Sequence, residues 1–179
     1  MRWAWVMVVM SAPAFAHGFG VELGSSYLPL QGGAAADAAL EFRISLPRAG
    51  SIDLRSHVSL MLERLARPST LSSTPAAVQT VTVRYRTPSA GEAIGFSLAM
   101  GPGLLVAYDV KRGGDTSAHN LGFAFELSPT VDLRLGDVVH FLLAVNVIAG
   151  FARAQPVLSA GLAAGFVFDL TPPRAEPQR

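Results

Sequence analysis

Apolar and polar residues alternate along most of this chain. The clearest example is the segment 51–63, SIDLRSHVSLMLE, in which one parity is largely apolar and the other carries the ionisable side chains. A period of two places successive side chains on opposite sides of a sheet. The segment therefore predicts a β-strand with one apolar face and one charged face.

The same alternation recurs in eight segments that are separated by turn residues. They are expected at about 19–28, 38–46, 51–63, 78–87, 94–110, 121–135, 138–150 and 157–170. One parity continues through 94–110 across Gly101-Pro102-Gly103, which favours a single long, bent strand over two strands joined by a Pro-Gly turn. Almost every charge inside a segment lies on the parity of small and polar residues.

The connections between these segments are expected to alternate in length. Pro47–Gly50, Pro88–Glu92 and Gly136-Asp137 are short, whereas the connections after the first, third, fifth and seventh segments are mostly longer. This asymmetry is typical of an up-and-down barrel with tight turns at one rim and loops at the other. The predicted fold is all-β, a closed eight-stranded antiparallel up-and-down transmembrane β-barrel.

The N-terminus carries an export pattern. A short apolar run follows Arg2, and Ala14-Phe15-Ala16 places small residues where a signal peptidase cleaves. We predict a signal peptide at 1–16, a barrel at 17–170 and a polar tail at 171–179. The alternative, a retained helix, is too short for a span of roughly 20 residues and contains Pro13.

Composition supports a membrane location and excludes several functions. Mean hydropathy is +0.38 and only 15% of residues are charged, against about a quarter in soluble domains. Removal of Arg2 leaves 13 basic and 13 acidic residues, so a nucleic-acid partner is not expected. The chain has no Cys, hence no disulfide and no thiolate chemistry. We expect no metal and no cofactor, because the histidines lack ligand spacing and no phosphate-binding loop is present.

Alternation alone does not decide which face is inside, but the chemistry of the polar face does. The polar parity consists mostly of Gly, Ala, Ser and Thr with scattered Arg and carboxylates, and Lys111 is the chain's only lysine. A soluble barrel would carry Lys and Glu on its outer surface. Small residues with paired charges suit the interior of a narrow barrel instead. The apolar face is therefore expected to contact lipid. The strands must then close into a barrel, because hydrocarbon offers no water to hydrogen-bond with the backbone groups of an open edge.

The chain resembles the small eight-stranded outer-membrane barrels, the class of outer membrane protein A and outer membrane protein X. The resemblance covers about 17–170 and rests on the signal, the strand number, the loop asymmetry and the last strand, GFVFDL at 165–170. It implies residence in the outer membrane and insertion by the barrel-assembly machinery. Relatives usually end on an aromatic residue, whereas this strand ends on Leu170 and is followed by a polar tail.

We predict that the charged residues of the polar parity form an ionic network in the lumen. An eight-stranded barrel is about wide enough to be filled by its side chains, and buried charges need partners. The expected members are Glu22, Glu41, Arg43, Asp53, Arg55, His57, Glu63, Arg84, Arg86, Asp109, Glu126, Asp132, Arg134 and Asp169. A conducting or gated pore is the alternative interpretation of the same residues.

His57 and Ser59 share one side of their strand and resemble the His-x-Ser arrangement of outer-membrane lipid A deacylases. A serine nucleophile needs a neighbouring base. In those enzymes the pair faces lipid, whereas parity sends His57 and Ser59 inward beside Arg55. We therefore predict a hydrogen-bonded histidine in the lumen, with catalysis as the alternative.

Five cations are predicted to cluster at the long-loop rim: Arg64, Arg67, Lys111, Arg112 and Arg153. They are ordinary solvated charges or contacts to the phosphates of lipopolysaccharide. The expected function is that of a monomeric, non-enzymatic integral outer-membrane protein with a structural or surface-interaction role. Its expected partners are membrane lipid and lipopolysaccharide. The alternatives are a lipid A hydrolase, a narrow pore and a secreted lipocalin-like barrel.

Overall fold

The computed structural model describes residues 18–46, 49–61, 63, 77–90, 93–110, 116–152 and 155–170. The predicted signal peptide and the predicted tail lie outside these residues. Among the described residues, no helix is long and apolar enough to cross a membrane. The described part of the chain contains eight strands: β1 (Gly18–Leu28), β2 (Gly33–Leu46), β3 (Gly50–Leu60), β4 (Ala77–Arg86), β5 (Ile94–Val110), β6 (Thr116–Arg134), β7 (Val139–Ala152) and β8 (Gln155–Asp169).

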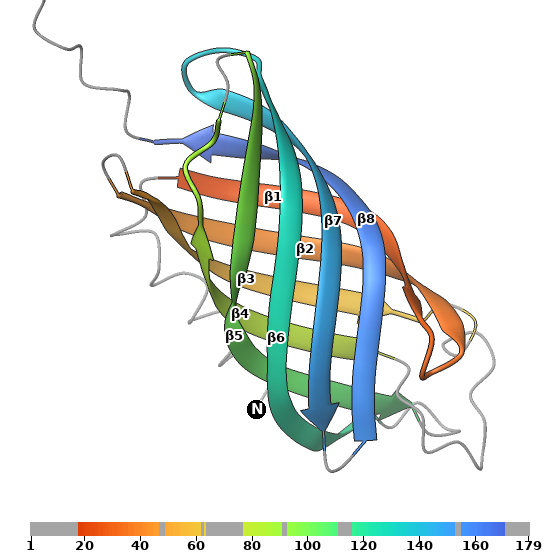
Figure 1. The fold of residues 1–179 in the computed structure, drawn as a ribbon. Coiled ribbons are helices and arrows are strands. Elements are labelled where there is room, and N and C mark those ends of the chain that lie inside the picture. Colours follow the sequence, from red (N-terminus) through yellow and green to blue (C-terminus); the bar gives the residue numbers. More distant parts are fainter. Residues whose placement is uncertain are drawn as a thin grey trace, which may run out of the picture.

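The eight strands close into one antiparallel barrel in which each strand pairs with its neighbours in sequence (Figure 1). Closure is made by β1 and β8, whose register runs from Gly18 opposite Asp169 to Tyr27 opposite Ala160. No strand edge is left open along this seam. The predicted fold class, a closed eight-stranded antiparallel barrel, is confirmed.

Two differences from the predicted strands affect the interior. β2 begins at Gly33 instead of about residue 38, which brings Asp37 into the barrel wall. β3 ends at Leu60, so Glu63 lies beyond the strand with an exposed side chain. The prediction that Glu63 joins the lumen network is therefore wrong.

The segment 94–110 forms the single strand β5, so the alternative of two strands joined by a Pro-Gly turn is wrong. β5 pairs with β6 along its whole length, with one irregularity at Ala107/Tyr108. Pairing with the other neighbours is interrupted near two prolines. The β4–β5 ladder lapses beside Pro102 and the β6–β7 ladder lapses beside Pro129, where proline has no N–H to donate.

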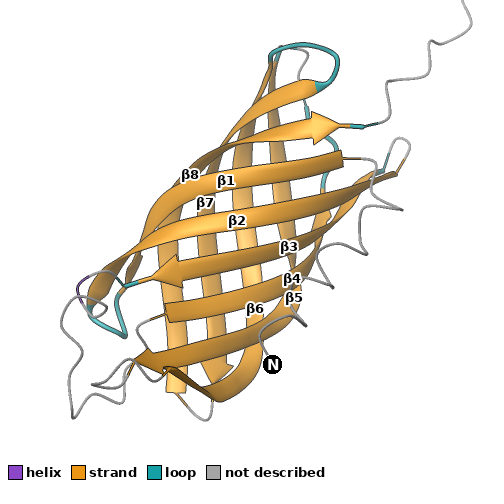
Figure 2. Ribbon diagram, turned by 180° about the vertical axis from the view of Figure 1, so that it is seen from behind, coloured by secondary structure: helices purple, strands orange, loops and turns teal. Residues whose placement is uncertain are grey.

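The connections do not alternate in length as regularly as predicted. At one rim β2–β3, β4–β5 and β6–β7 are joined through 47–49, 87–93 and 135–138. At the other rim only the β3–β4 connection, 61–76, is long, whereas 29–32, 111–115 and 153–154 are short. Because the strand number is even, Gly18 and Asp169 both lie at the first rim, which we call the short-turn rim (Figure 2). The opposite rim is the long-loop rim.

The two faces of the wall differ sharply in chemistry. Large apolar side chains point outward on every strand, and Phe123 keeps 77% of its surface exposed. Opposite them, the inward positions hold the charged side chains, many Ser and Thr, and small residues. The outward apolar face and the polar lumen predicted from parity are thus both present.

The lumen also contains an apolar layer that parity did not predict. It lies toward the long-loop rim, where inward positions near the strand ends carry Leu28, Met61 and Leu105, each 0–1% exposed. The whole cluster consists of Leu28, Ala35, Met61, Val78, Leu105, Ala107, Ala124, Ile148 and Val157. The interior therefore has two layers: charged side chains at the centre, and apolar side chains between them and the long-loop rim.

Candidate functional site in the barrel lumen

A balanced ionic network occupies the centre of the lumen. It is supplied by β1, β2, β3, β4 and β6, so its members are far apart in sequence. Four carboxylates and four guanidiniums take part: Glu22, Glu41, Asp53 and Glu126 with Arg43, Arg55, Arg84 and Arg86. Matched numbers of opposite charges satisfy the requirement that buried ions be paired.

Arg55 links opposite sides of the barrel. Its Nη2 donates to Oε2 of Glu22 on β1 at 2.7 Å, and its Nη1 donates to Oε1 of Glu126 on β6 at 2.5 Å. Arg55 and Glu126 are both 0% exposed. The Thr82 hydroxyl donates to the second oxygen of Glu126 at 2.7 Å. The network thus ties the wall together across the lumen and not only between adjacent strands.

Glu41 is the second point of convergence. It accepts from Arg43 Nη2 at 3.0 Å and from Arg86 Nη2 at 3.0 Å, and it also pairs with Arg84. Arg86 Nε in turn donates to Asp53 Oδ2 at 2.7 Å. Guanidinium groups suit this role because their several donors are held in a rigid plane.

Small residues occupy several inward positions on the wall opposite the charged strands. On β7 and β8 the inward positions beside the network include Ala144, Ala163 and Gly165. Asn146 and Ser159 are buried polar residues on the same two strands. Long side chains from β3 and β4 need such space in a lumen of this width. The Ser128 hydroxyl donates to Asn146 Oδ1 at 2.5 Å, which joins β6 and β7 where their backbone ladder lapses.

His57 belongs to a separate polar group between the network and the apolar layer. Its Nε2 lies 3.6 Å from Oδ1 of Asp37, and the Ser26 hydroxyl donates to the same oxygen at 3.0 Å. Asp37 is absent from the predicted network, because the predicted segment begins only at about residue 38. Extending the parity of Glu41 and Arg43 back along β2 would have found it.

The candidate catalytic pair faces the interior. His57 and Ser59 are each 2% exposed and point into the lumen from β3, where Ser59 pairs in register with Val78 of the apolar layer. Neither side chain reaches the outer apolar surface. A lipid ester in the surrounding bilayer would therefore not contact the serine hydroxyl. Among the described residues, no group of three or more His, Asp or Glu is placed to hold a metal ion.

The remaining predicted members lie elsewhere. Asp169 pairs with His140, with 3.2 Å between Oδ2 and Nε2, at the short-turn rim and not in the central network. Asp132 and Arg134 form no ion pair or side-chain hydrogen bond with any described residue. The side chain of Asp109 and all five cations of the predicted lipopolysaccharide cluster lie outside the described residues.

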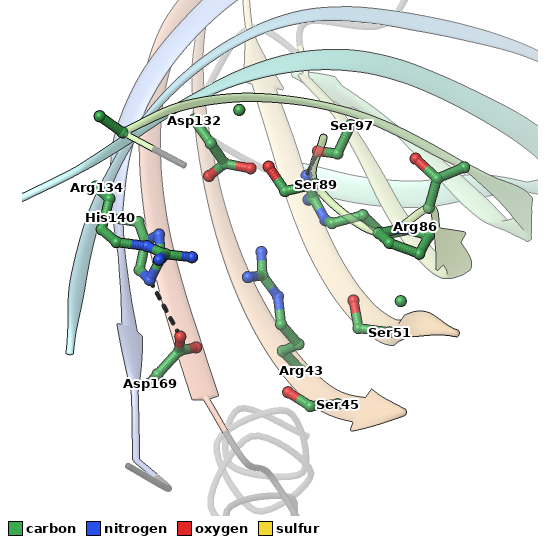
Figure 3. A pocket seen from close by; sticks show the side chains of 15 residues that line it. Arg43, Ser45, Ser51, Arg86, Ser89, Ser97, Asp132, Arg134, His140 and Asp169 are labelled. Carbon is green, nitrogen blue, oxygen red and sulfur yellow. Dashed lines mark hydrogen bonds and ion pairs between the residues drawn. The ribbon is translucent and has the colours of Figure 1, made fainter. Parts of the chain in front are cut away.

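A polar cavity opens below the network at the short-turn rim (Figure 3). Its volume is about 160 Å3. Among the residues that line it are Arg43, Ser89, Ser97, Asp132, Arg134, His140 and Asp169. These side chains come from β2, β5, β6, β7, β8 and the β4–β5 connection, so only closure of the barrel assembles them.

A closed eight-stranded barrel with an apolar outer surface and an ionic interior defines a small transmembrane β-barrel of the outer-membrane type. Neisserial surface protein A is similar in structure, with a TM-score of 0.68 at 11% identity over 85% of this chain and 94% of that one. The attachment invasion locus protein Ail of Yersinia pestis, solved with the heparin analogue sucrose octasulfate, is also similar. Its TM-score is 0.51 at 12% identity, over 84% of this chain and 98% of that one.

The N-terminal barrel domain of Pseudomonas aeruginosa OprF gives a TM-score of 0.50 at 8% identity, over 86% of this chain and 98% of that domain. At these identities the likeness concerns the fold. No protein-family model matches the sequence, and no curated protein matches it.

Proposed function

We propose that this protein is an integral outer-membrane β-barrel with a structural or surface-interaction role and a lumen that does not conduct. The observation that carries the proposal is the filling of the lumen at two successive levels. Ion-paired arginines and carboxylates occupy the centre, and the cluster around Leu28, Met61 and Leu105 lies above them.

Membrane insertion is supported by the outer surface. Leu121, Phe123 and Leu162 are between 67% and 77% exposed, a cost in water that disappears in hydrocarbon. A secreted lipocalin-like barrel would need the opposite arrangement, with apolar residues inside and charged residues outside. Burying a balanced set of eight charges inside such a barrel would leave no apolar ligand cavity at its centre.

Conductance separates the filled barrel from the narrow pore. We expect refolded protein in planar bilayers to show no steady single-channel current, because Arg55, Arg84 and Leu105 are each 0–1% exposed. Refolding is checked first by a heat-modifiable shift in electrophoretic mobility. Steady conductance that changes on Arg84→Ala would contradict the filled lumen. Recovery of the protein from the soluble periplasm without detergent would contradict membrane residence.

The hydrolase alternative is disfavoured by the burial of its candidate residues. Lipid substrate would have to enter the packed lumen to reach Ser59, which is 2% exposed beside Val78 of the apolar layer. Incubation with lipopolysaccharide should therefore release no fatty acid. Release that is lost in Ser59→Ala but kept in Ser45→Ala, a hydroxyl at the short-turn rim, would establish the enzyme and overturn the proposed role.

The partners we propose are outer-membrane lipid, lipopolysaccharide and the barrel-assembly machinery, with the protein acting as a monomer. The lipopolysaccharide contact rests on the sequence cluster of Arg64, Arg67, Lys111, Arg112 and Arg153. Neutralising all five should weaken lipopolysaccharide binding to the refolded barrel. Unchanged binding would remove this partner and leave the proposed role of the barrel itself intact.

A further inference from the structure

Asp132 is a buried carboxylate that has no partner among the described residues. It lies on β6, faces the short-turn cavity and is only 8% exposed. No described residue forms an ion pair or hydrogen bond with its side chain. Every other carboxylate that is buried to this degree, from Glu22 to Glu126, has a described partner. The carboxylate faces the cavity, so it can accept hydrogen bonds from a positively charged group bound there.

Two guanidinium groups that line the same cavity have N–H donors without a described partner. Figure 3 shows the guanidinium of Arg43 and the carboxylate of Asp132 entering the cavity from different strands. Arg43 Nη2 donates to Glu41 Oε1, and Arg43 Nε lies 3.5 Å from Asp53 Oδ1. Arg134 follows Asp132 on the same inward parity, is exposed, and has no ion pair with a described residue.

The cavity thus offers an acceptor for an ammonium group and donors for an anion. Ser89 and Ser97 add hydroxyls beside Asp132, on the side where Gly95 has no side chain. A cavity needs on the order of 10–15 Å3 of accessible volume to hold one water. About 160 Å3 therefore accommodates several waters or one small molecule.

We propose that the short-turn cavity binds a small soluble zwitterion, namely an α-amino acid. Its ammonium group would pair with Asp132, and its carboxylate would pair with Arg134 and Arg43. A simple anion would leave Asp132 uncompensated, and a simple cation would leave Arg134 unused. A lipid headgroup is disfavoured because inward-facing residues such as Asp132, His140 and Asp169 line the cavity, whereas bilayer lipids contact the outer face of the wall.

This inference goes beyond the proposed function and does not depend on it. The cavity lies on the short-turn side of the ionic network, so a ligand can enter it while the lumen stays closed to ions. Failure of amino-acid binding would leave the non-conducting barrel unaffected. Conversely, a conducting lumen would not by itself remove the site.

Equilibrium dialysis of radiolabelled glycine against the refolded, detergent-solubilised protein tests the proposal. We expect saturable binding, with acetate and methylammonium competing more weakly than unlabelled glycine or alanine. Asp132→Asn should weaken binding roughly tenfold or more, since a charge-assisted pair is lost. Arg134→Gln should weaken it several-fold, because the pair with the ligand carboxylate is lost. This variant should fold normally, since Arg134 is exposed and has no ion pair with a described residue.

Asp137→Asn is the matched control, because Asp137 is exposed in the β6–β7 turn and does not line the cavity. Its glycine affinity should equal that of the unmodified protein. If Asp132→Asn does not refold, Arg134→Gln and the competition series still decide. Three results would overturn the proposal: no saturable binding below roughly 50 mM, acetate competing as well as glycine, or Asp132→Asn and Arg134→Gln binding normally. Competition by phosphoethanolamine but not by alanine would reassign the cavity to a lipid headgroup.

Discussion

Arg84 on β4 reaches Glu126 on β6 across the intervening strand β5, with 2.7 Å between Nη1 and Oε1. The crossing occurs beside Gly101, which pairs with Glu126 in the β5–β6 register. A Cβ atom at Gly101 would lie 2.8 Å from the Cα of Arg84 and 1.9 Å from the carbonyl oxygen of Val83. The missing side chain on β5 therefore lets the backbones of β4 and β5 approach closely where the arginine crosses.

Removal of Arg84 should destabilise the barrel by about 3 kcal/mol, because it leaves buried carboxylate charge without full compensation. Arg84→Ala is compared with Arg134→Ala, whose guanidinium is exposed and forms no ion pair with a described residue. Equilibrium unfolding in denaturant measures both. Equal, small losses for the two variants would mean that the central network does not stabilise the fold.

Gly101→Ala should cost about 1–3 kcal/mol, because the added methyl meets the backbone of β4. Gly136→Ala is the control, since nothing lies within 4 Å of a Cβ at that position in the β6–β7 turn. The same unfolding measurement distinguishes them. A neutral Gly101→Ala would show that β4 and β5 separate easily beside Pro102.

The apolar layer predicts a contrast between adjacent residues on one strand. Leu105 is fully buried in the lumen, whereas Leu104 faces outward and is 49% exposed. Leu105→Ala should cost about 2–5 kcal/mol through cavity formation, and Leu104→Ala should cost clearly less. A larger loss for Leu104 would place the packed core on the outer face and contradict the assignment of faces.

Contact with lipid predicts that the cost of an outward-facing arginine depends on its depth in the bilayer. Leu143, on β7 near the middle of the wall, is 46% exposed, and Leu135, at the short-turn rim, is 63% exposed. Leu143→Arg should destabilise folding into lipid vesicles by about 2–4 kcal/mol, and Leu135→Arg by about 0–1 kcal/mol. In a water-exposed barrel the two substitutions would be equally tolerated, so equal effects would contradict membrane insertion.

Much of the architecture was accessible from local patterning. The alternation in SIDLRSHVSLMLE placed Asp53, Arg55 and His57 on one face, and all three are buried in the lumen. The pattern of the sequence does not show the start of β2, because the Ala and Gly residues around Asp37 give little contrast between apolar and polar positions. Asp37, the partner of His57, lies in this unpredicted part of β2.

Which charges meet was not accessible from the sequence. Parity put Asp132, Arg134 and Asp169 on the same face as Glu126, but their height along the barrel axis places them at the short-turn cavity instead. Parity states which face a residue occupies, whereas strand stagger states its depth.

The sequence alone determined the strand number and the two faces of the wall, because period-two alternation is a local property of the chain. The signal peptide at 1–16 stays a prediction. The tertiary structure alone decided that Arg55 joins Glu22 to Glu126, and that apolar side chains fill the lumen on the long-loop side of this network. It also decided that Asp132 has no partner among the described residues. These relationships cross the lumen, so they depend on the closure and stagger of all eight strands together.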